Sequence, residues 1–470
     1  MDKLLEMGEA PLGKLLLKFS LPTVAIMLVN GLYNFVDRIF IGQGMGTPAL
    51  AAVTAGFPMM LVAEGIGALF SAGAGTLISM AMGAGKREEA ASALGQAFVA
   101  ALASALPVMA ASWIFMDPIL RLFGTTEEIM PIARAYIGIV TVGFAFQIVS
   151  MAVANSLRSQ NRPRSAMAAT LSGTALNAIL APLFIFAFKW GIAGAAWATV
   201  AAQGLSCALT LAFVQGKESI LKIEARNFKP KLSTLGSIAK IGSSLLLVHV
   251  LALVMLMVAN NSMARFGGAT ALAAIGIINA LSQLLAFPVM GVTQGAGALW
   301  GYNYGAGKPE RVKRLTGIAI AWTTAIGLVA TLAIELFPRA FIAAFNGSDP
   351  ALMEIGTRGI AIFMLSFFTF GIQATTANLF IAVGRAGRGG MLYVLRQLLG
   401  IAAMAILPTF MGIEGVYWSG PITDLVCTIV AVIVLALGLK ELGLRVPVED
   451  LPSAEGLDLD DGPRAAVRIS

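Results

Sequence analysis

The 470-residue chain is 58% hydrophobic and only 12% charged, and its mean hydropathy is +0.84. Soluble domains carry roughly 25% charged residues, so this composition excludes a soluble protein and predicts a chain that lies mostly within a bilayer. The net charge of +7 is therefore no sign of a nucleic-acid partner, and none is expected.

Long apolar runs recur along the whole chain. A helix needs about 20 residues to cross a bilayer, and twelve runs reach this length. We therefore predict an all-α polytopic membrane protein. Its twelve transmembrane helices are expected at 15–41, 49–82, 91–116, 131–157, 165–188, 191–215, 236–264, 269–303, 314–338, 350–383, 389–411 and 414–439.

The sequence repeats itself at a constant spacing. GAGKREEA at 83–90 matches GAGKPERV at 305–312, and GTPALAAVTAG from Gly46 matches GATALAAIGII from Gly268, both 222 residues apart. GIAGAAWAT from Gly191 matches GIEGVYWSG from Gly412. These matches keep one order, so we predict two homologous six-helix halves related by an axis along the membrane normal.

The repeat divides the chain into four parts. We expect an N-terminal six-helix lobe at 1–216, a basic cytoplasmic linker at 217–240 and a C-terminal six-helix lobe at 241–444. Residues 445–470 are polar and acidic, which predicts a disordered cytoplasmic tail.

The two GAGK segments resemble phosphate-binding loops only superficially. A phosphate loop needs Gly, four residues and then Gly-Lys-Ser/Thr, whereas Pro309 follows Lys308 and Asn303 stands where the first glycine is required. We interpret both segments as turns between helices, and we predict no enzymatic activity, no cofactor and no metal site.

The basic residues predict the orientation. Most of the 32 Lys and Arg residues fall before the first helix, in every second connection and after the last helix. The positive-inside rule then places both termini in the cytoplasm of a multi-pass protein of a prokaryotic inner (plasma) membrane.

Several segments together resemble the multidrug and toxic compound extrusion (MATE) family over roughly residues 10–440. They are SLPTVAIMLVNGLYNFVDRIFIGQ in the first helix, the pair LISMAMGAGK and LWGYNYGAGK, LNAILAPLFIF, and GIAGAAWAT. The resemblance implies two lobes in a V around a central cavity. It also implies export of amphipathic, often cationic compounds, driven by entry of protons or sodium ions.

Asp37 in the first helix is the strongest candidate for coupling. A carboxylate inside a transmembrane helix is costly unless it faces a cavity, and a desolvated one binds protons more readily. The alternative is a structural carboxylate bonded to nearby amides. The resemblance implies that Asn155, Asn177 and Thr199 join Asp37, and that Pro22 is a hinge.

The chain departs from the family at one position. The fifth helix of the family normally reads Asn-x-x-x-Asp-Pro, whereas here Asn177 is followed by Ala181 and Pro182. A dehydrated sodium ion needs compensating charge, so we favour protons over sodium as the coupling ion.

Four further polar residues are candidates for the cavity or the substrate site. Glu64 in the second helix could replace the missing carboxylate or hold cationic substrate, and a structural role is equally open. His249 could titrate, although its apolar neighbours favour a hydrogen-bonded core residue. Gln294 could line the cavity or join helices, and Asp424 in the last helix could serve the C-terminal lobe.

The preferred function is a secondary active multidrug exporter that works by alternating access as a monomer. Its partners would be small-molecule drugs or toxic metabolites and membrane lipids. The alternative is a flippase for lipid-linked oligosaccharides or other lipids, which shares the paired bundles but should show a strongly basic cavity. A membrane receptor or scaffold without transport is a third class.

Overall fold

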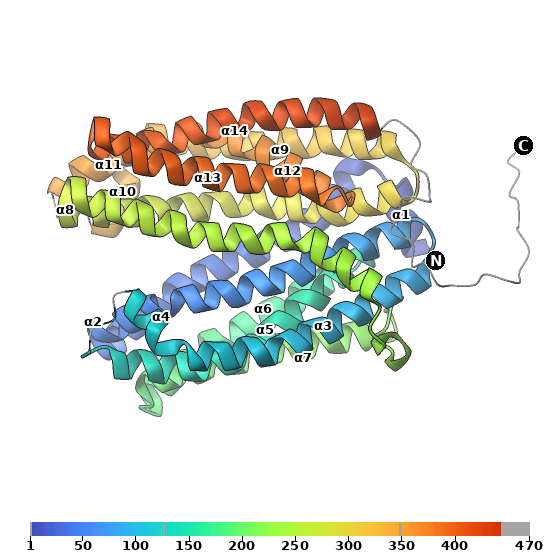
Figure 1. The fold of residues 1–470 in the computed structure, drawn as a ribbon, viewed down its shortest axis with the longest axis horizontal. Coiled ribbons are helices and arrows are strands. Elements are labelled where there is room, and N and C mark those ends of the chain that lie inside the picture. The colour runs from blue at the N-terminus through green and yellow to red at the C-terminus, as the bar shows by residue number, and fades with distance from the viewer. Residues whose placement is uncertain (1, 124, 126, 347–349, 443–470) are drawn as a thin grey trace, which may run out of the picture.

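The computed structural model describes residues 2–123, 125, 127–346 and 350–442, and these form two bundles of helices that lie side by side (Figure 1). The predicted tail at 445–470 lies outside the described residues. In the first half the elements are α1 (Asp2–Glu9), α2 (Leu12–Gly83), α3 (Arg87–Ile114), α4 (Met116–Leu122), α5 (Met130–Ser159), α6 (Pro163–Pro182), the π-helical η1 (Leu183–Ala187) and α7 (Gly191–Gln215).

The second half repeats this order. After the short η2 (Ala225–Phe228), its elements are α8 (Leu232–Gly305), α9 (Pro309–Leu336), α10 (Pro338–Asn346), α11 (Pro350–Met364), α12 (Phe367–Ala382), α13 (Ala386–Met411) and α14 (Ile413–Leu442). We call the bundle of α2–α7 the N lobe and that of α8–α14 the C lobe. Helix α8 begins at Leu232, within the range predicted as linker.

The helices account for the twelve predicted spans. Eleven of the described helical segments are long and apolar enough to cross a membrane, and α11 with α12 adds a twelfth that is bent by 44°. Helix α2 contains two spans because Gly46, at φ 77° and ψ −173°, turns the chain within it. Helix α8 likewise holds the spans Leu232–Gly267 and Ala274–Gly305.

The backbone repeats as the sequence does. Gly85 and Gly307 have φ of 77° and 67° in the two GAGK turns, and Gly191 and Gly412 have φ of 57° and 61° where the last span of each lobe begins. Positive φ favours glycine because a Cβ would clash with the backbone. The conformations therefore recur at equivalent points of both lobes, which fits the internal duplication.

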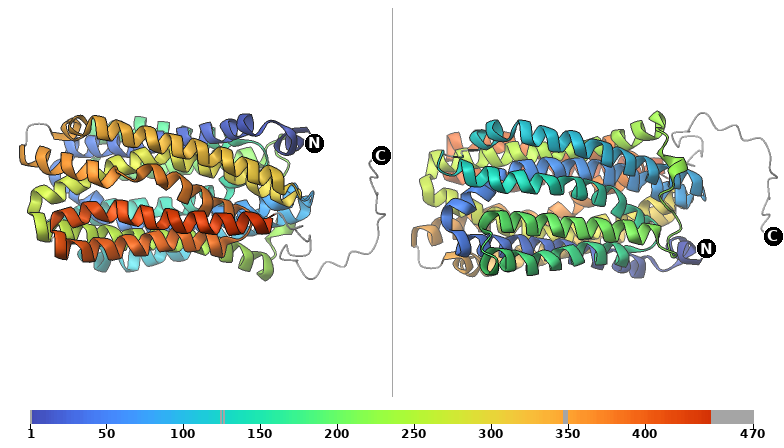
Figure 2. Two further views of the ribbon diagram at one scale, coloured as in Figure 1. Left: turned by 90° about the horizontal axis from the view of Figure 1, so that it is seen from above. Right: turned by 90° about the horizontal axis from the view of Figure 1, so that it is seen from below.

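Glycines also bring the two lobes together at one end of the molecule. Asp2 and Leu442 lie at this end (Figures 1 and 2), which we call the terminal end. A Cβ at Gly242 of α8 would overlap the carbonyl oxygen of Leu69 of α2, and one at Gly73 of α2 would overlap that of Ile238 of α8. Here the helices pack backbone against backbone.

The N-terminal segment ties the lobes together at the same end. Glu6 of α1 bonds to Lys18 Nζ at 2.7 Å and accepts a hydrogen bond from Asn161 Nδ2 at 2.9 Å, in the α5–α6 turn of the N lobe. Lys308 Nζ, in the α8–α9 turn of the C lobe, donates to Gly8 O at 3.1 Å. Lys308 therefore bonds to the chain itself, in keeping with a turn rather than a phosphate loop.

Candidate functional site

Two of the predicted coupling residues meet in the N lobe. Asn177 of α6 donates through Nδ2 to Thr199 Oγ1 of α7 at 3.3 Å, and Thr199 in turn donates to Ala195 O at 3.1 Å. Asn177 is 3% exposed, and its Oδ1 is buried with no hydrogen-bond partner among the described residues. A buried acceptor without a donor is costly, so this oxygen is suited to accept a proton donor or a cation.

Asp37 lies on α2 in the first span, and its side chain is outside the described residues. Its helix nevertheless contacts the same region of the N lobe. Phe40, three residues further along, meets Phe186 of η1 edge-on, with ring centroids 6.4 Å apart. The first span therefore runs along the end of the α6–η1 helix, whose earlier turns carry Asn177.

Asn155 occupies a different place. Its Nδ2 donates to Ser71 O of α2 at 2.9 Å, and its Oδ1 accepts from Arg158 Nε at 2.8 Å. Asn155 lies four residues from the terminal end of α5, whereas Asn177 lies 14 residues into α6 from the same end. At 1.5 Å per residue the two differ in depth by about 15 Å. Asn155 thus joins α5 to α2, and the structure does not group it with Asn177 and Thr199.

Glu64 of α2 is exposed. Gly65 packs against His249 of α8 and Gly67 against Met151 of α5, so at 100° per residue Glu64 points between these two contacts and away from both. A carboxylate that faces lipid is costly. We therefore expect Glu64 to face a water-filled space.

The internal repeat supports this orientation of Glu64. The sequence matches on either side of Glu64 are 222 residues apart, which makes Ala286 its counterpart in the C lobe. Ala286 lines a cavity of that lobe, described below. The same face of the N lobe should therefore be hollow.

The remaining polar candidates are half-buried. His249 lies within 2.8 Å of Leu245 O through Nδ1, and because a carbonyl oxygen only accepts, Nδ1 carries the proton. This is the bond expected of a core histidine, although His249 also packs on the N lobe at Gly65. Gln294 is half-buried on α8, with no hydrogen bond of its side chain among the described residues. Pro22 is buried within α2, where the helix continues through it.

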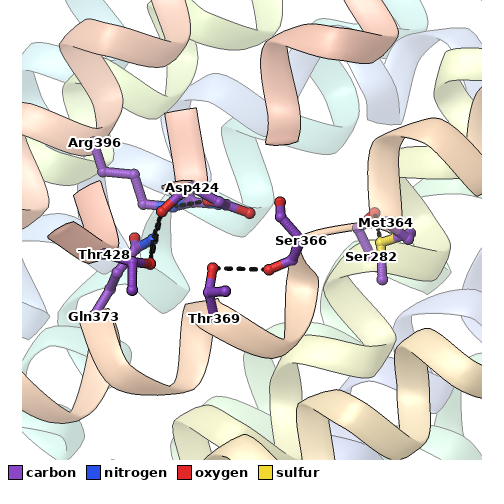
Figure 3. A network of polar contacts seen from close by, with 8 residues as sticks. All are labelled: Ser282, Met364, Ser366, Thr369, Gln373, Arg396, Asp424 and Thr428. Atoms are coloured by element: carbon purple, nitrogen blue, oxygen red, sulfur yellow. Dashed lines mark hydrogen bonds and ion pairs between the residues drawn. The ribbon is translucent and has the colours of Figure 1, made fainter. Parts of the chain in front are cut away.

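The C lobe contains an ion pair within the bundle (Figure 3). Arg396 of α13 donates from both Nε and Nη2 to Asp424 Oδ1 of α14, each at 3.0 Å. Gln373 Nε2 of α12 donates to the backbone oxygen of Asp424 at 2.6 Å and to Thr428 Oγ1 at 2.9 Å. Asp424 lies between Arg396 and Ser366, at the break between α11 and α12 (Figure 3).

This pair lines a cavity of about 210 Å³. We call it the C-lobe cavity. Its polar wall consists of Asn279, Ser282, Gln283, Ser419, Thr423 and the ion pair, and its apolar wall of three phenylalanines and three methionines: Phe363, Phe367, Phe370, Met255, Met364 and Met404. Aromatic rings and adaptable thioethers with a few polar groups are typical of a small-molecule site.

Arg396 is the residue that sequence reasoning missed. It was visible as a cation inside a predicted helix, but its partner was not. Phe410 stands midway between Arg396 and Asp424 in the sequence, next to the α13–α14 turn. An antiparallel hairpin brings such residues to a similar depth, so this symmetric spacing was the available signal.

Comparison with known proteins agrees with the two-lobe architecture. The MatE family model matches residues 22–183 and 244–406, most of each lobe. The chain belongs to this family. MATE proteins are membrane transporters, so this chain is a multi-pass membrane transporter and not an enzyme.

Relatives match this MATE transporter over nearly its whole length. The multidrug export protein MepA of Staphylococcus aureus (strain N315) is 25% identical over 436 residues, which cover 93% of this chain and 96% of the relative. MepA of Staphylococcus haemolyticus (strain JCSC1435) is 25% identical over 435 residues, covering 92% and 95%.

Solved structures share the fold. A crystal structure of MATE in complex with MaL6 superposes with a TM-score of 0.88 at 21% identity, covering 93% of this chain and 98% of that one. An outward-facing MATE family transporter of the MOP superfamily gives the same values. The predicted all-α fold with two six-helix lobes is thereby confirmed.

Proposed function

We propose that the protein exports amphipathic, often cationic drugs or toxic metabolites by antiport with an inward-moving cation. The observation that carries this proposal is the family match to both lobes, together with multidrug export by full-length relatives. The transporter would work as a monomer in a prokaryotic plasma membrane with both termini in the cytoplasm, which the distribution of its basic residues supports.

Protons are the proposed coupling ion. Ala181, fully buried, stands where the family pattern has a second carboxylate, so Asp37 would be the acidic group of the N-lobe site. Asn177 Oδ1 is a buried acceptor that a protonated carboxyl could satisfy. One carboxyl with one amide acceptor can exchange a proton, whereas a dehydrated sodium ion needs several oxygens and compensating charge.

Alternating access would follow from differential binding. Protonation of Asp37 from outside would favour the state that releases substrate, and loss of the proton to the cytoplasm would favour the state that binds it. The close packing at the terminal end supports a form closed toward the cytoplasm. Opening that end would require the lobes to separate along their glycine contacts.

Reconstitution into liposomes tests the proposal. Vesicles with an imposed pH gradient or an imposed sodium gradient are compared for accumulation of a cationic dye such as ethidium. We expect accumulation to follow the pH gradient. Accumulation that followed only the sodium gradient would contradict proton coupling, and dye flux under neither gradient would contradict antiport.

The same vesicles address the flippase alternative. A pyrophosphate headgroup calls for several unpaired cations, whereas the C-lobe cavity offers Arg396, which is paired with Asp424. We therefore expect no translocation of a lipid-linked sugar. Translocation without dye flux would favour the flippase instead.

A further inference from the structure

The exposed member of the C-lobe ion pair is the cation. The side chain of Arg396 is 29% exposed, whereas that of Asp424 is 6% exposed. The tip that the cavity presents to a ligand is therefore guanidinium rather than carboxylate. This is unexpected in a transporter proposed to carry cations, because a cation would be repelled by the more accessible group.

The geometry of the pair leaves part of the guanidinium available. Asp424 takes the side edge of Arg396, Nε and Nη2, and both bonds end on one oxygen, Oδ1. A guanidinium has a second edge, formed by Nη1 and Nη2, that can bind another carboxylate in parallel hydrogen bonds. Nη1 has no hydrogen bond among the described residues, so this second edge is open.

The cavity contains further unused hydrogen-bonding capacity. Thr423 adjoins Asp424 on α14 and lines the cavity, and it is 6% exposed. Its Oγ1 is buried without a hydrogen-bond partner among the described residues. A buried hydroxyl without a partner is costly, and a ligand oxygen next to Arg396 would supply the partner.

The apolar wall indicates the rest of the ligand. The guanidinium of Arg396 lies 5.0 Å from the centroid of the Phe370 ring, which fixes the plane of the cation against an aromatic face. Phe363 and Phe367 continue that face, and three methionines complete it. Flat aromatic groups are the ligands that such a wall favours.

We propose that the C-lobe cavity binds the carboxylate of an aromatic anion or zwitterion, with Arg396 as the group that selects it. The carboxylate would lie on the Nη1–Nη2 edge, with one oxygen near Thr423 and the ring system among the phenylalanines. This deepens the proposed export function, on which its physiological meaning rests, by adding carboxylate-bearing aromatic compounds to the substrates.

Equilibrium binding to the purified full-length protein tests this proposal. The probes are 2-naphthoate and its uncharged analogue 2-naphthamide, measured by isothermal titration in detergent and corrected with protein-free micelles. Charge-assisted hydrogen bonds are the stronger kind, so we expect naphthoate to bind about tenfold more tightly or better. Equal affinities for the two probes would overturn the proposal.

Four variants connect the preference to Arg396. R396Q alone leaves Asp424 buried and unpaired, so the double variant R396Q/D424N is used because it removes both charges. It should lose the preference for naphthoate, and R396K should keep part of it because Lys keeps the charge without the fork. D424N should strengthen naphthoate binding by removing the competing carboxylate. R358Q, which changes an exposed arginine paired with Glu414, should bind as wild type.

A preference that survives in R396Q/D424N, or that disappears in D424N, would overturn the assignment. The result is separable from the export proposal because binding needs no gradient. Wild-type protein that exports ethidium along a gradient but binds both probes equally would refute the carboxylate site alone. Protein that prefers naphthoate but moves no dye would refute the export proposal alone.

Discussion

The two lobes share one backbone plan but differ in their polar interiors. In the N lobe, Asn177 and Thr199 form an uncharged pair with an unused acceptor. With the offsets of the neighbouring sequence matches, their counterparts in the C lobe are Gly400 and Gly420, and both line the C-lobe cavity. The duplicated fold thus places two sites at equivalent depth, one built from amide and hydroxyl and the other opened by glycine.

The charged residues differ in the same way. Asp37 corresponds to Ala259, which is 2% exposed, and Glu64 corresponds to Ala286. The C lobe instead carries Arg396 and Asp424 on its last two helices. After duplication, the same architecture can therefore hold a proton site in one lobe and a ligand site in the other, because each needs only a few side chains on a common scaffold.

Replacing Asp37 should give the largest effect. We expect D37N to abolish gradient-driven ethidium export, because an amide cannot exchange the coupling proton. D117N is the matched control, because Asp117 lies on α4 outside the spans and pairs with Arg134 on the exposed surface. Transport is measured in liposomes at equal amounts of reconstituted protein. Wild-type export by D37N would remove the proposed division between the lobes.

Asn177 should matter less than Asp37. We expect N177A to lower export about tenfold, the effect of losing a hydrogen bond to a charged or protonated group of roughly 1.5–3 kcal/mol. It should also shift the pH dependence of export, which loss of packing alone would not do. T170V is the control, because its hydroxyl bonds to Ala166 O within α6. An unchanged pH profile in N177A would separate Asn177 from the coupling site.

A pair of glycine variants examines where the lobes meet. G242A should lower the thermal stability of the closed form by roughly 1–3 kcal/mol, since its Cβ would overlap Leu69 O. G236A, six residues earlier on α8, has nothing within 4 Å and should be neutral or slightly stabilising. Melting temperatures in detergent make the comparison. Equal melting temperatures would show that this contact does not hold the lobes together.

The smallest expected effect concerns Glu6. Hydrogen bonds from Lys18, and then from Asn161, hold the pKa of the Glu6 carboxyl below its usual value of 4.5. A lowered pKa in the folded protein means that the contribution to stability is complete above that value and is lost as the pH falls below it.

E6Q should therefore lower the melting temperature slightly at pH 7, and the difference from wild type should vanish in acid. E9Q is the control, because Glu9 is exposed on the same helix. A difference that persisted at low pH would point to packing of α1 rather than to its charge.

Most of the fold was readable from the sequence. Apolar length predicted the twelve spans, and spacing predicted the repeat, because both depend on properties that each residue carries alone. The bend between Met364 and Phe367 was not predicted, since no proline or glycine marks it. The π-helical turn after Pro182 was also missed, because the choice between helix types depends on the contacts around it.

The sites were less predictable than the fold. The sequence placed Asn177 next to Thr199 only through the family resemblance, and it grouped Asn155 with them although its partners are Ser71 and Arg158. Depth along a helix follows from counting residues, but the direction of a side chain depends on which neighbours pack beside it. Arg396 shows the same limit, because its partner lies on another helix.

The glycine contacts at the terminal end have a consequence for turnover. Surfaces made of bare backbone can part and meet again as rigid bodies, since no rotamers need to rearrange and few buried side chains need to become hydrated. Enlarging Gly73 or Gly242 should then slow every cargo by the same factor, whatever its charge or size, because the penalty falls on the shared opening step rather than on recognition.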